Sequence, residues 1–585
     1  MLKRRSSADL AIHRAIIESE KLLAAPDLYF RGDYFVLGTS LIVKSFGWVS
    51  TDTYFNSLGT RRWLEETPLR DLDFNLSVES GRGHLTLWLR TVDTISLITG
   101  PIEFDGSDVS VRIRIPDRPG ILFWRVNALT EVTIRGAAFG TIEPAHRNVK
   151  FAIVITAFRR DEAVRSAIER FTASSLPKDG HRLFVIDNGH TLEPLNLHWG
   201  AIIRNVNLGG AGGFTRGLIE AKADGGFTHC LFMDDDASTH MECIKRSACI
   251  LSWVDDDRLA ISGSMLQEEH PHILHEVGGI IRKPLGIRPL FGGMDAANLD
   301  NLVRLETEDP DYGAWWFFAF PLKHTSHLAF PFFVRGDDIQ FSRANGFRTI
   351  TMNGVACWQQ KFDDKINPGT EYLAQRSEFL IGLLANDTRI GWFWLAIRAV
   401  RNAQREASSL RYGHANARLD AIRDVLCGPG FFEREPSAVR RLLEIRHLYV
   451  NEFASPIGRQ LAGARKANIG KRRRVISRLF HFLTASWHFV PNRFLSPRPM
   501  VIPTLGCVSG FPPRQHLIYY SPHLQVGFHV QKSAYKYVLI LWRSFVLMLR
   551  ISICGRKIQK EYEAKLEYLQ SEKFWSRVLG KHIAG

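Results

Sequence analysis

The chain has 585 residues, of which 45% are hydrophobic and 23% charged, a mixture typical of globular proteins. This length and composition exclude a disordered chain, a collagen-like repeat and a small disulfide-held protein, and they suggest three or four domains. The net charge of +15 is uneven, because residues 451–585 hold 22 Lys and Arg against 5 Asp and Glu. The basic C-terminal part predicts an anionic partner such as a lipid surface, nucleic acid or a phosphorylated acceptor, with a solvated basic face as the alternative.

Residues 1–28 are expected to form an arm or a short helix. No continuous apolar stretch follows the basic N-terminal residues, so we expect no signal peptide. No run of 18 uncharged apolar residues occurs, so we expect no transmembrane helix. The seven cysteines lack CxxC spacing, which favours a reducing compartment and no structural zinc.

Residues 29–147 contain short alternating strands separated by Gly, Asp and Pro, a pattern that predicts a β-sandwich. The tryptophans of this part fit either a core or a platform for carbohydrate. Residues 148–365 alternate apolar strands with helices, which predicts an open α/β sheet of the Rossmann type. Ligands of such sheets bind beyond the carboxyl ends of the strands.

Asp234, Asp235 and Asp236 directly follow the apolar residues of the fourth predicted α/β strand. Clustered carboxylates repel one another unless a cation gathers them, and two of them can hold Mg²⁺ or Mn²⁺ against a diphosphate. The alternative is a set of helix caps for the segment after Thr239. The triplet Asp255–Asp257 follows a helix and is interpreted as a surface turn.

Two further motifs lie in the same domain. The glycine-rich run Asn207–Phe214 is interpreted either as a loop that binds phosphate through backbone N–H groups or as a tight turn. Asp337 and Asp338 open a predicted helix, where paired carboxylates suit a general base but also suit helix capping. Trp315 and Trp316 fit either a core or a surface that stacks on a sugar ring.

Residues 366–585 are predicted to be mainly helical and basic, with a long final helix from about Ser533. In that helix Lys536, Arg543, Arg550 and Lys557 recur every seven residues between apolar segments. The pattern predicts either a helix in a membrane interface, with its basic side chains reaching lipid phosphates, or a helix in the core of the domain.

Six motifs in order give the chain a family resemblance. They are TYFN at Thr53–Asn56, ITAFRR at Ile155–Arg160, NLGGAGGF at Asn207–Phe214, FMDDDAS at Phe232–Ser238, AWWFFAFP at Ala314–Pro321 and VRGDDIQF at Val334–Phe341. The chain resembles the bacterial galactofuranosyltransferases of the mycobacterial galactan-polymerase type, in glycosyltransferase family two. The resemblance implies a GT-A fold at residues 148–365, between the β-sandwich at 29–147 and the helical domain at 366–585.

The resemblance also implies roles for single residues and a metal cofactor, Mn²⁺ or Mg²⁺. Asp338 matches the catalytic base and Asp337 its acidic neighbour. The implied substrate-binding residues are Thr156, Arg160, Asp187, Asn207, Gly209, Gly210, Asp235, Trp315 and Trp316. Asp234 and Asp236 match the metal ligands, and Gln359 stands where the family has a histidine ligand. An amide oxygen binds a hard cation less strongly than imidazole binds Mn²⁺.

The predicted function is inverting transfer of galactofuranose from UDP-galactofuranose to a glycan acceptor, expected to be lipid-linked, in cell-envelope polysaccharide synthesis. The alternatives are a transferase of the same fold with another nucleotide sugar, such as rhamnose, and a degenerate glycan-binding protein. We expect the protein in the cytoplasm, peripheral on the inner face of the plasma membrane through its basic C-terminal part, with no nucleic-acid partner. A homo-oligomer is compatible with the sequence, which does not decide the oligomeric state.

Overall fold

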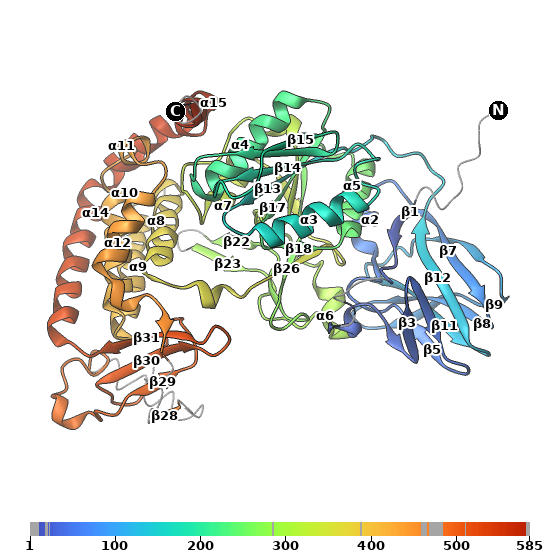
Figure 1. Cartoon of the computed structure of the whole chain (residues 1–585), viewed down its shortest axis with the longest axis horizontal. Helices are drawn as coiled ribbons and strands as arrows, with labels where there is room; N and C mark the ends of the chain where they lie inside the picture. The colour runs from blue at the N-terminus through green and yellow to red at the C-terminus, as the bar shows by residue number, and fades with distance from the viewer. Residues whose placement is uncertain are drawn as a thin grey trace.

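The computed structural model describes residues 11–17, 22, 24–282, 286–385, 389–457, 465–466, 484–508 and 511–580. It has three parts in a row: a β-sandwich at one end, an α/β part in the middle and a mainly helical part at the other end (Figure 1). The predicted fold class is therefore confirmed.

The N-terminal part consists of two antiparallel six-stranded sheets. In β7 (Asp71–Ser80) every second side chain is buried, from Leu72 to Val78, because the strand packs one face on the partner sheet. The first sheet also holds β10 (Val109–Arg114), β12 (Val132–Gly140), β4 (Ser40–Val43), β3 (Tyr34–Leu37) and β1 (Ala11–Arg14). The second holds β2 (Arg31–Gly32), β5 (Trp48–Ser50), β11 (Ile121–Ala128), β8 (Arg82–Arg90), β9 (Ile95–Asp105) and β6 (Leu58–Gly59).

The N-terminal arm differs from the predicted helix at residues 11–14. These residues form β1, which pairs antiparallel with β12 and so extends the first sheet of the sandwich. Ile12 and His13 are buried there, and His13 lies within hydrogen-bond distance of the Phe55 carbonyl (3.1 Å). Residues 1–10 lie outside the described residues.

The α/β part is built on an eight-stranded sheet in the order β15-β16-β14-β13-β17-β24-β19-β25. Its strands are β15 (Leu195–Leu197), β16 (Gly200–Arg204), β14 (Arg182–Asp187), β13 (Phe151–Ala157), β17 (His229–Asp234), β24 (Phe318–Pro321), β19 (Leu259–Ser262) and β25 (Arg348–Ile350). Its main helices are α3 (Asp161–Ala173), α4 (Gly209–Asp224), α5 (Met241–Trp253) and α7 (Asp337–Asn345). Strands β16, β14, β13 and β17 are parallel, so their carboxyl ends meet at one edge of the sheet.

A smaller sheet crosses this edge, in the order β18-β26-β20-β21. It consists of β18 (Ser238–Thr239), β26 (Ala356–Gln359), β20 (Ser264–Gln267) and β21 (Leu274–Glu276). Gln359 ends β26 and Glu276 ends β21, so this sheet carries both toward the carboxyl end of β17. The remaining elements around it are α2 (Thr60–Glu66), β22 (Gly279–Arg282), β23 (Gly286–Pro289), α6 (Leu299–Arg304) and the 3-10 turn η4 (Phe362–Lys365).

The C-terminal part combines helices with a five-stranded sheet. The helices are α8 (Pro368–Leu384), α9 (Arg389–Ser408), α10 (Tyr412–Val425), α11 (Gly430–Arg434), α12 (Val439–Leu448), α14 (Ala534–Leu569) and α15 (Glu572–Gly580). The strands are β27 (Ser455–Pro456), β28 (Arg465–Lys466), β29 (Met500–Ile502), β30 (His516–Ser521) and β31 (Val526–Gln531). Most of the basic stretch at 463–478 lies outside the described residues.

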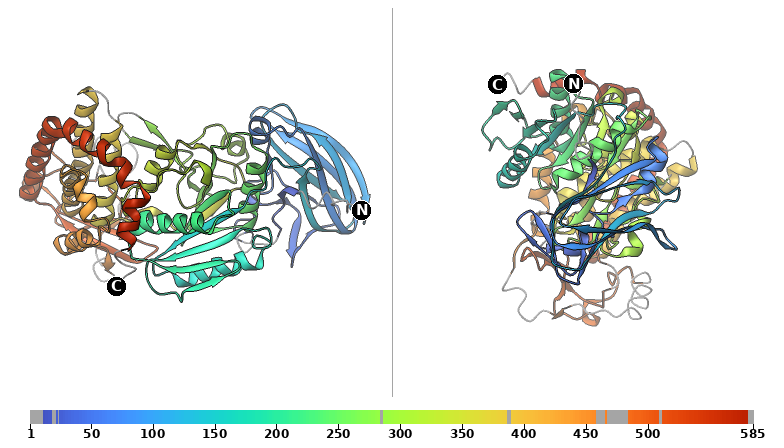
Figure 2. Two further views of the ribbon diagram at one scale, coloured as in Figure 1. Left: turned by 90° about the horizontal axis from the view of Figure 1, so that it is seen from above. Right: turned by 90° about the vertical axis from the view of Figure 1, so that its right-hand side faces the viewer.

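Helix α14 begins after Ser533, as predicted, and runs along the outer side of the helical part, at the end farthest from the sandwich (Figure 2). Of its four basic residues at heptad spacing, Lys536, Arg550 and Lys557 are exposed and Arg543 is half-buried. Arg543 donates to the Asp420 carboxylate on α10 (2.8 Å), and Arg550 donates to the Leu426 carbonyl. Arg543 turns toward the helical part because the buried Asp420 carboxylate can pair with it, while the other three basic side chains stay in contact with solvent.

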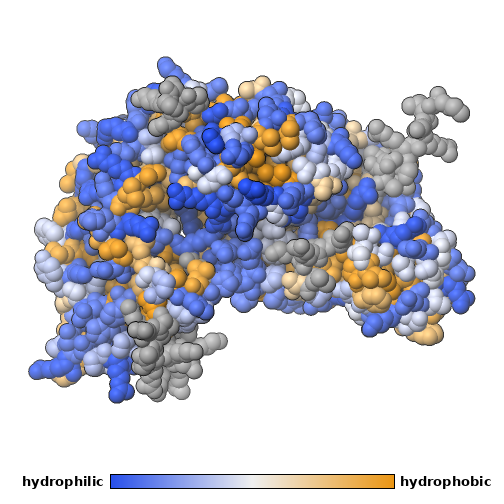
Figure 3. All heavy atoms as spheres, viewed as in Figure 1, coloured by the Kyte–Doolittle hydropathy of each residue, from blue (hydrophilic) through white to orange (hydrophobic). Residues whose placement is uncertain are grey.

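Apolar side chains are also exposed along the outward face of α14. They include Tyr535, Val538, Leu539, Leu541, Trp542, Phe545, Val546, Leu549 and Ile553, all exposed. Hydrophobic atoms are visible at this end of the molecule in Figure 3. Within the described residues, one helix, α14, has the length and the apolar composition needed to cross a membrane. In its most apolar window, 28% of the residues are buried. That finding differs from the expectation of no such segment.

Candidate active site

Five carboxylates gather at the carboxyl edge of the parallel strands. Asp234, Asp235 and Asp236 leave the end of β17, and Thr156 on β13 pairs in register with Asp234. Asp337 and Asp338 form the first turn of α7, next to the start of α4. A Cβ added to Gly210 would lie 3.4 Å from an Asp337 oxygen, so the two helix starts are in contact.

The aspartate triplet is surrounded by hydrogen-bond donors. Gln359 donates its amide Nε2 to Asp234 (3.1 Å) and also to Asp236. Lys365 Nζ lies 2.8 Å from Asp236 Oδ2, and the Arg160 guanidinium forms an ion pair with the same carboxylate. These contacts make Asp236 the most strongly neutralised member of the triplet.

The pKa values of the triplet follow from burial and these contacts. Burial, with the charges of Asp236 and Asp235, raises the pKa of Asp234 to about 7. Burial also raises the pKa of Asp235 to about 6. Burial alone would raise the pKa of Asp236, but Lys365 and Arg160 hold it below its ordinary value. Asp236 therefore stays charged, while Asp234 holds a proton more readily than an ordinary aspartate.

The second carboxylate pair is shaped by Gly336, whose φ of 77° is the left-handed conformation that suits glycine before α7. Burial raises the pKa of Asp338 to about 6, although the Arg335 charge opposes the rise. Burial and then the Asp338 charge raise the pKa of Asp337 well above its ordinary value. Asp338 therefore carries the negative charge of the pair, and its pKa suits a general base near neutral pH.

Glu276 is a site residue that sequence reasoning missed. It ends β21, and burial followed by the Asp338 charge raises its pKa to about 8. The sequence around it has no motif, and its position depends on the pairing of β21 with β20. The sequence signals Glu276 only as a glutamate at the end of a strand in the same domain.

Phe362, in turn η4, links the two carboxylate groups through cation–π contacts. The Arg335 guanidinium lies 4.7 Å from its ring centroid and the Lys365 Nζ lies 5.3 Å from it. The ring also packs edge-on against His275, next to Glu276. Sequence reasoning missed Phe362, Arg335 and Lys365, because a turn between two elements carries no periodic pattern.

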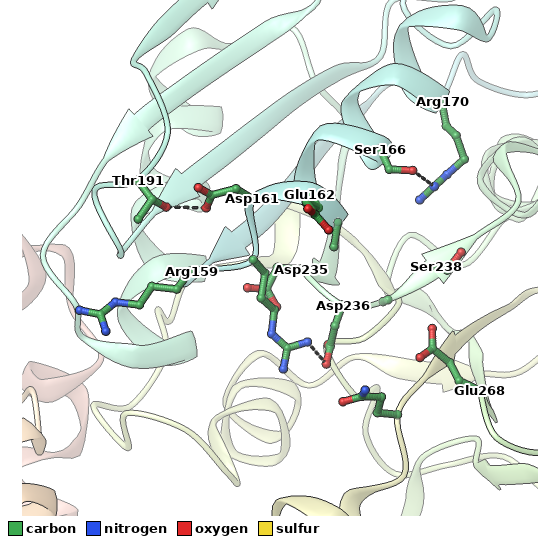
Figure 4. Close-up of a pocket in the computed structure, with 14 residues that line it drawn as sticks. Arg159, Asp161, Glu162, Ser166, Arg170, Thr191, Asp235, Asp236, Ser238 and Glu268 are labelled. Carbon is green, nitrogen blue, oxygen red and sulfur yellow. Dashed lines mark hydrogen bonds and ion pairs between the residues drawn. The ribbon is translucent and has the colours of Figure 1, made fainter. Parts of the chain in front are cut away.

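A cavity of about 800 Å³ lies beside the aspartate triplet. Figure 4 shows Asp235 and Asp236 at its wall, with Arg159 on the loop after β13, Asp161, Glu162 and Arg170 on α3, and Glu268 opposite. Phe158 N–H donates to Asp235 (2.9 Å), which ties this loop to the triplet. A polar cavity at the carboxyl edge of the sheet is where an α/β fold binds its ligand.

The other predicted substrate residues lie near this edge with contacts of their own. Asp187 is fully buried and accepts backbone N–H groups of Gly189 and Leu192, so its carboxylate holds a loop. Asn207 accepts the N–H of Gly209, the first residue of α4. The Thr156 hydroxyl is buried and has no hydrogen-bond partner within the described part of the chain.

The glycine-rich run is the first turns of α4 and not a free loop. A Cβ at Gly213 would lie 2.2 Å from Thr156 Cγ2, and one at Gly209 would lie 2.1 Å from the Phe333 carbonyl oxygen. These glycines allow α4 to pack closely on β13 and on the segment before α7. Arg216, two turns into α4, forms an ion pair with Glu220 on the same helix.

The two tryptophans are buried, with 5% exposure for Trp315 and 6% for Trp316. Trp315 packs against Phe214, Phe232 and Phe341, and Trp316 Nε1 donates to the Gly263 carbonyl (2.9 Å). The structure therefore gives both rings a packing role, and their contact with an acceptor sugar stays a prediction.

The residues expected to bind a metal do not fit a divalent ion as the structure places them. The groups that face Asp234 and Asp236 are an amide nitrogen, an ammonium and a guanidinium, which donate hydrogen bonds and do not coordinate cations. The Gln359 Oε1 points away from the carboxylates and is buried without a partner among the described residues. Within the described ranges, no three His, Cys, Asp or Glu side chains form a metal cluster.

Comparison with known proteins gives a distant relationship. No model of a known protein family matches the chain. The chain is 23% identical over 471 residues to galactofuranosyltransferase GlfT2 of Mycobacterium tuberculosis, covering 72% of each protein. It is 22% identical over 462 residues to GlfT2 of Mycolicibacterium smegmatis, covering 72% of this chain and 70% of the relative. The chain is a distant relative of GlfT2.

Solved glycosyltransferase structures match part of the chain at low similarity. GalNAc-T7 with UDP, GalNAc and Mn²⁺ has a TM-score of 0.35 and 11% identity, over 46% of this chain and 52% of that one. S. aureus TarS 1-349 has a TM-score of 0.29 and 13% identity, and the match covers 53% of this chain and 94% of that one. Mannosyltransferase PcManGT from Pyrobaculum calidifontis, with GDP-Man and Mn²⁺, has a TM-score of 0.27 and 10% identity. That match covers 53% of this chain and 87% of the other.

Proposed function

We propose that the chain is an inverting glycosyltransferase that moves galactofuranose from UDP-galactofuranose to a glycan acceptor. The observation that carries the proposal is the meeting of two carboxylate groups, Asp234–Asp236 and Asp337–Asp338, at the ligand-binding edge of one sheet. The distant relationship to GlfT2 supports galactofuranose as the first sugar to test.

The reaction assigned to this site is a single displacement. Asp338 takes the proton of the acceptor hydroxyl as that oxygen attacks the anomeric carbon of the donor sugar. The bond from the anomeric carbon to the β-phosphate oxygen breaks, and its electron pair leaves with UDP. The raised pKa of Asp337 favours its neutral form, so the negative charge of the pair stays on Asp338.

The donor is assigned to the cavity beside the aspartate triplet. Arg160 lies on the cavity wall, where its guanidinium can pair with the diphosphate. The predicted Mn²⁺ or Mg²⁺ stays a prediction from the resemblance. No step here is routed through it, because the neighbours of Asp234 and Asp236 are hydrogen-bond donors.

The acceptor is proposed to be a lipid-linked glycan at the inner face of the plasma membrane, where the exposed apolar face of α14 would meet lipid. The helix packs against α9 and α10 on its other side, which favours an interfacial position over a spanning one. Cosedimentation of the protein with phosphatidylglycerol vesicles tests this, and protein that stays in the supernatant at low salt would contradict it.

The function is tested by UDP release from a panel of donors, with and without a short galactofuranoside acceptor. The panel holds UDP-galactofuranose, UDP-galactopyranose and dTDP-rhamnose, each with Mn²⁺, Mg²⁺ or a chelator. Release that requires both UDP-galactofuranose and acceptor supports the proposal. Release only from another donor favours a transferase of different specificity, and binding of the glycan without any release favours a glycan-binding protein.

A further inference from the structure

Lys365 is placed against Asp236 by the local structure around it. Its Nζ lies 2.8 Å from Asp236 Oδ2 and 5.3 Å from the centroid of the Phe362 ring. The next helix fixes the end of this turn, because Asn367 and Thr370 form a capping box at the start of α8. Thr370 Oγ1 also donates to the Lys365 carbonyl (3.3 Å). The position of the ammonium is therefore determined by the fold.

Both cations at Asp236 keep donors that this carboxylate does not use. An ammonium has three N–H donors, and one of them points at Asp236. The Arg160 guanidinium has five, of which Nη1 contacts Asp236 while Nε lies 3.7 Å from Asp235. Arg160 and Asp236 line the 800 Å³ cavity, so the remaining guanidinium donors are available to an anion there, and Lys365 is bonded to the Asp236 carboxylate of the cavity wall.

Gln359 completes an arrangement in which carboxylates hold cationic side chains. Its side chain is 2% exposed and gives its amide nitrogen to both Asp234 and Asp236. A histidine here would offer a ring nitrogen as a metal ligand, whereas this amide nitrogen has no lone pair for a metal. Lys365 and Arg160 neutralise Asp236, as a bound cation otherwise would, and the neutral Gln359 amide adds hydrogen bonds to Asp234 and Asp236.

We propose that Lys365 and Arg160 take the place of the divalent cation in this site, so that donor binding and transfer need no metal. This inference rests on the proposed function. The two side chains, oriented by Asp236, bind the diphosphate of the nucleotide sugar. When the bond between the anomeric carbon and the β-phosphate oxygen breaks, the electron pair stays on that oxygen, where the ammonium and guanidinium stabilise it. The acceptor proton goes to Asp338.

The test is UDP binding to the full chain by calorimetry, in a chelator and then in Mn²⁺. We expect the dissociation constant of UDP to differ less than threefold between the two conditions. Lys365→Ala should weaken binding in the chelator at least tenfold, and Lys365→Arg should restore most of it. Lys323→Ala is the matched control, because Lys323 forms the same kind of pair (2.6 Å) with Asp257 on the surface. Its affinity for UDP should not change.

A second variant tests the assignment by gain of metal binding. Gln359→His combined with Lys365→Ala should create a Mn²⁺ site with a metal-bound spectrum in electron paramagnetic resonance, which the wild type should lack at the same concentration. Three results would each overturn the inference: UDP binding only with Mn²⁺, no UDP binding in either condition, and unchanged UDP binding in Lys365→Ala. Metal-free UDP binding through Lys365 without sugar transfer would keep the inference and reject the proposed function. Transfer that requires Mn²⁺ would support the proposed function and overturn this inference.

Discussion

The pH dependence of transfer gives a direct test of Asp338 as the base. A base works when it is deprotonated, and burial raises the pKa of Asp338 to about 6. The acid limb of kcat/KM should therefore have its midpoint near pH 6, two units above that of an ordinary aspartate. At pH 7 about nine-tenths of Asp338 is charged and at pH 5 about one-tenth, so the rate should fall roughly tenfold between them.

A substitution at Arg335 should shift the midpoint of the acid limb of kcat/KM while Asp338 stays in place. The positive charge of Arg335 lowers the pKa of Asp338, so Arg335→Gln should shift the midpoint to higher pH and leave the plateau rate within about threefold. The assay is initial UDP release at low donor concentration from pH 4.5 to 9, with a thermal unfolding scan of each variant. A midpoint near pH 4, or a midpoint that Arg335→Gln moves to lower pH, would refute the assignment of Asp338.

Three other predictions follow from single contacts. Glu276→Gln should keep the transfer rate at pH 6.5 within about threefold of wild type, because a pKa of about 8 leaves Glu276 neutral there. The variant should also show a smaller loss of rate above pH 8. A large loss of rate at pH 6.5 would show that the charge of Glu276 is needed. Gly213→Ala should destabilise the protein by about 1–3 kcal/mol in urea unfolding, because its Cβ would overlap β13, whereas Gly136→Ala, with open space around it, should change stability by less than about 0.5 kcal/mol. Trp542→Ser should lower the fraction bound to phosphatidylglycerol vesicles several-fold, because that exposed indole lies on the apolar face of α14; unchanged binding would place the contact elsewhere.

The sequence was sufficient for features that depend on local pattern. Continuous apolar runs identified β13, β14 and β17, because strands buried on both faces have no polar alternation. Asp234 and Asp338 could be proposed because one ends such a strand and the other opens a helix. Their proximity follows from the rule that the carboxyl ends of parallel strands share an edge.

Features that depend on contacts between distant segments could not be predicted. Glu276 and Lys365 reach the site through the β20–β21 pairing and through the turn before α8. The glycines of α4 could be interpreted as a phosphate loop or as packing residues; the position of Thr156 shows the packing role of Gly213, and phosphate binding stays a prediction. In α14 the heptad of basic residues was visible, but the inward turn of Arg543 depends on Asp420 in another helix.

The most direct test of the central claim is product analysis of the acceptor after incubation with UDP-galactofuranose. Wild-type protein should lengthen a galactofuranoside acceptor by galactofuranose units, detected by mass spectrometry and linkage analysis. Asp338→Asn should fold, bind UDP and lose transfer by about 100- to 10,000-fold, while the surface control Asp257→Asn stays active. An acceptor that wild-type protein leaves unchanged with this donor, or one that Asp338→Asn extends at the wild-type rate, would contradict the account.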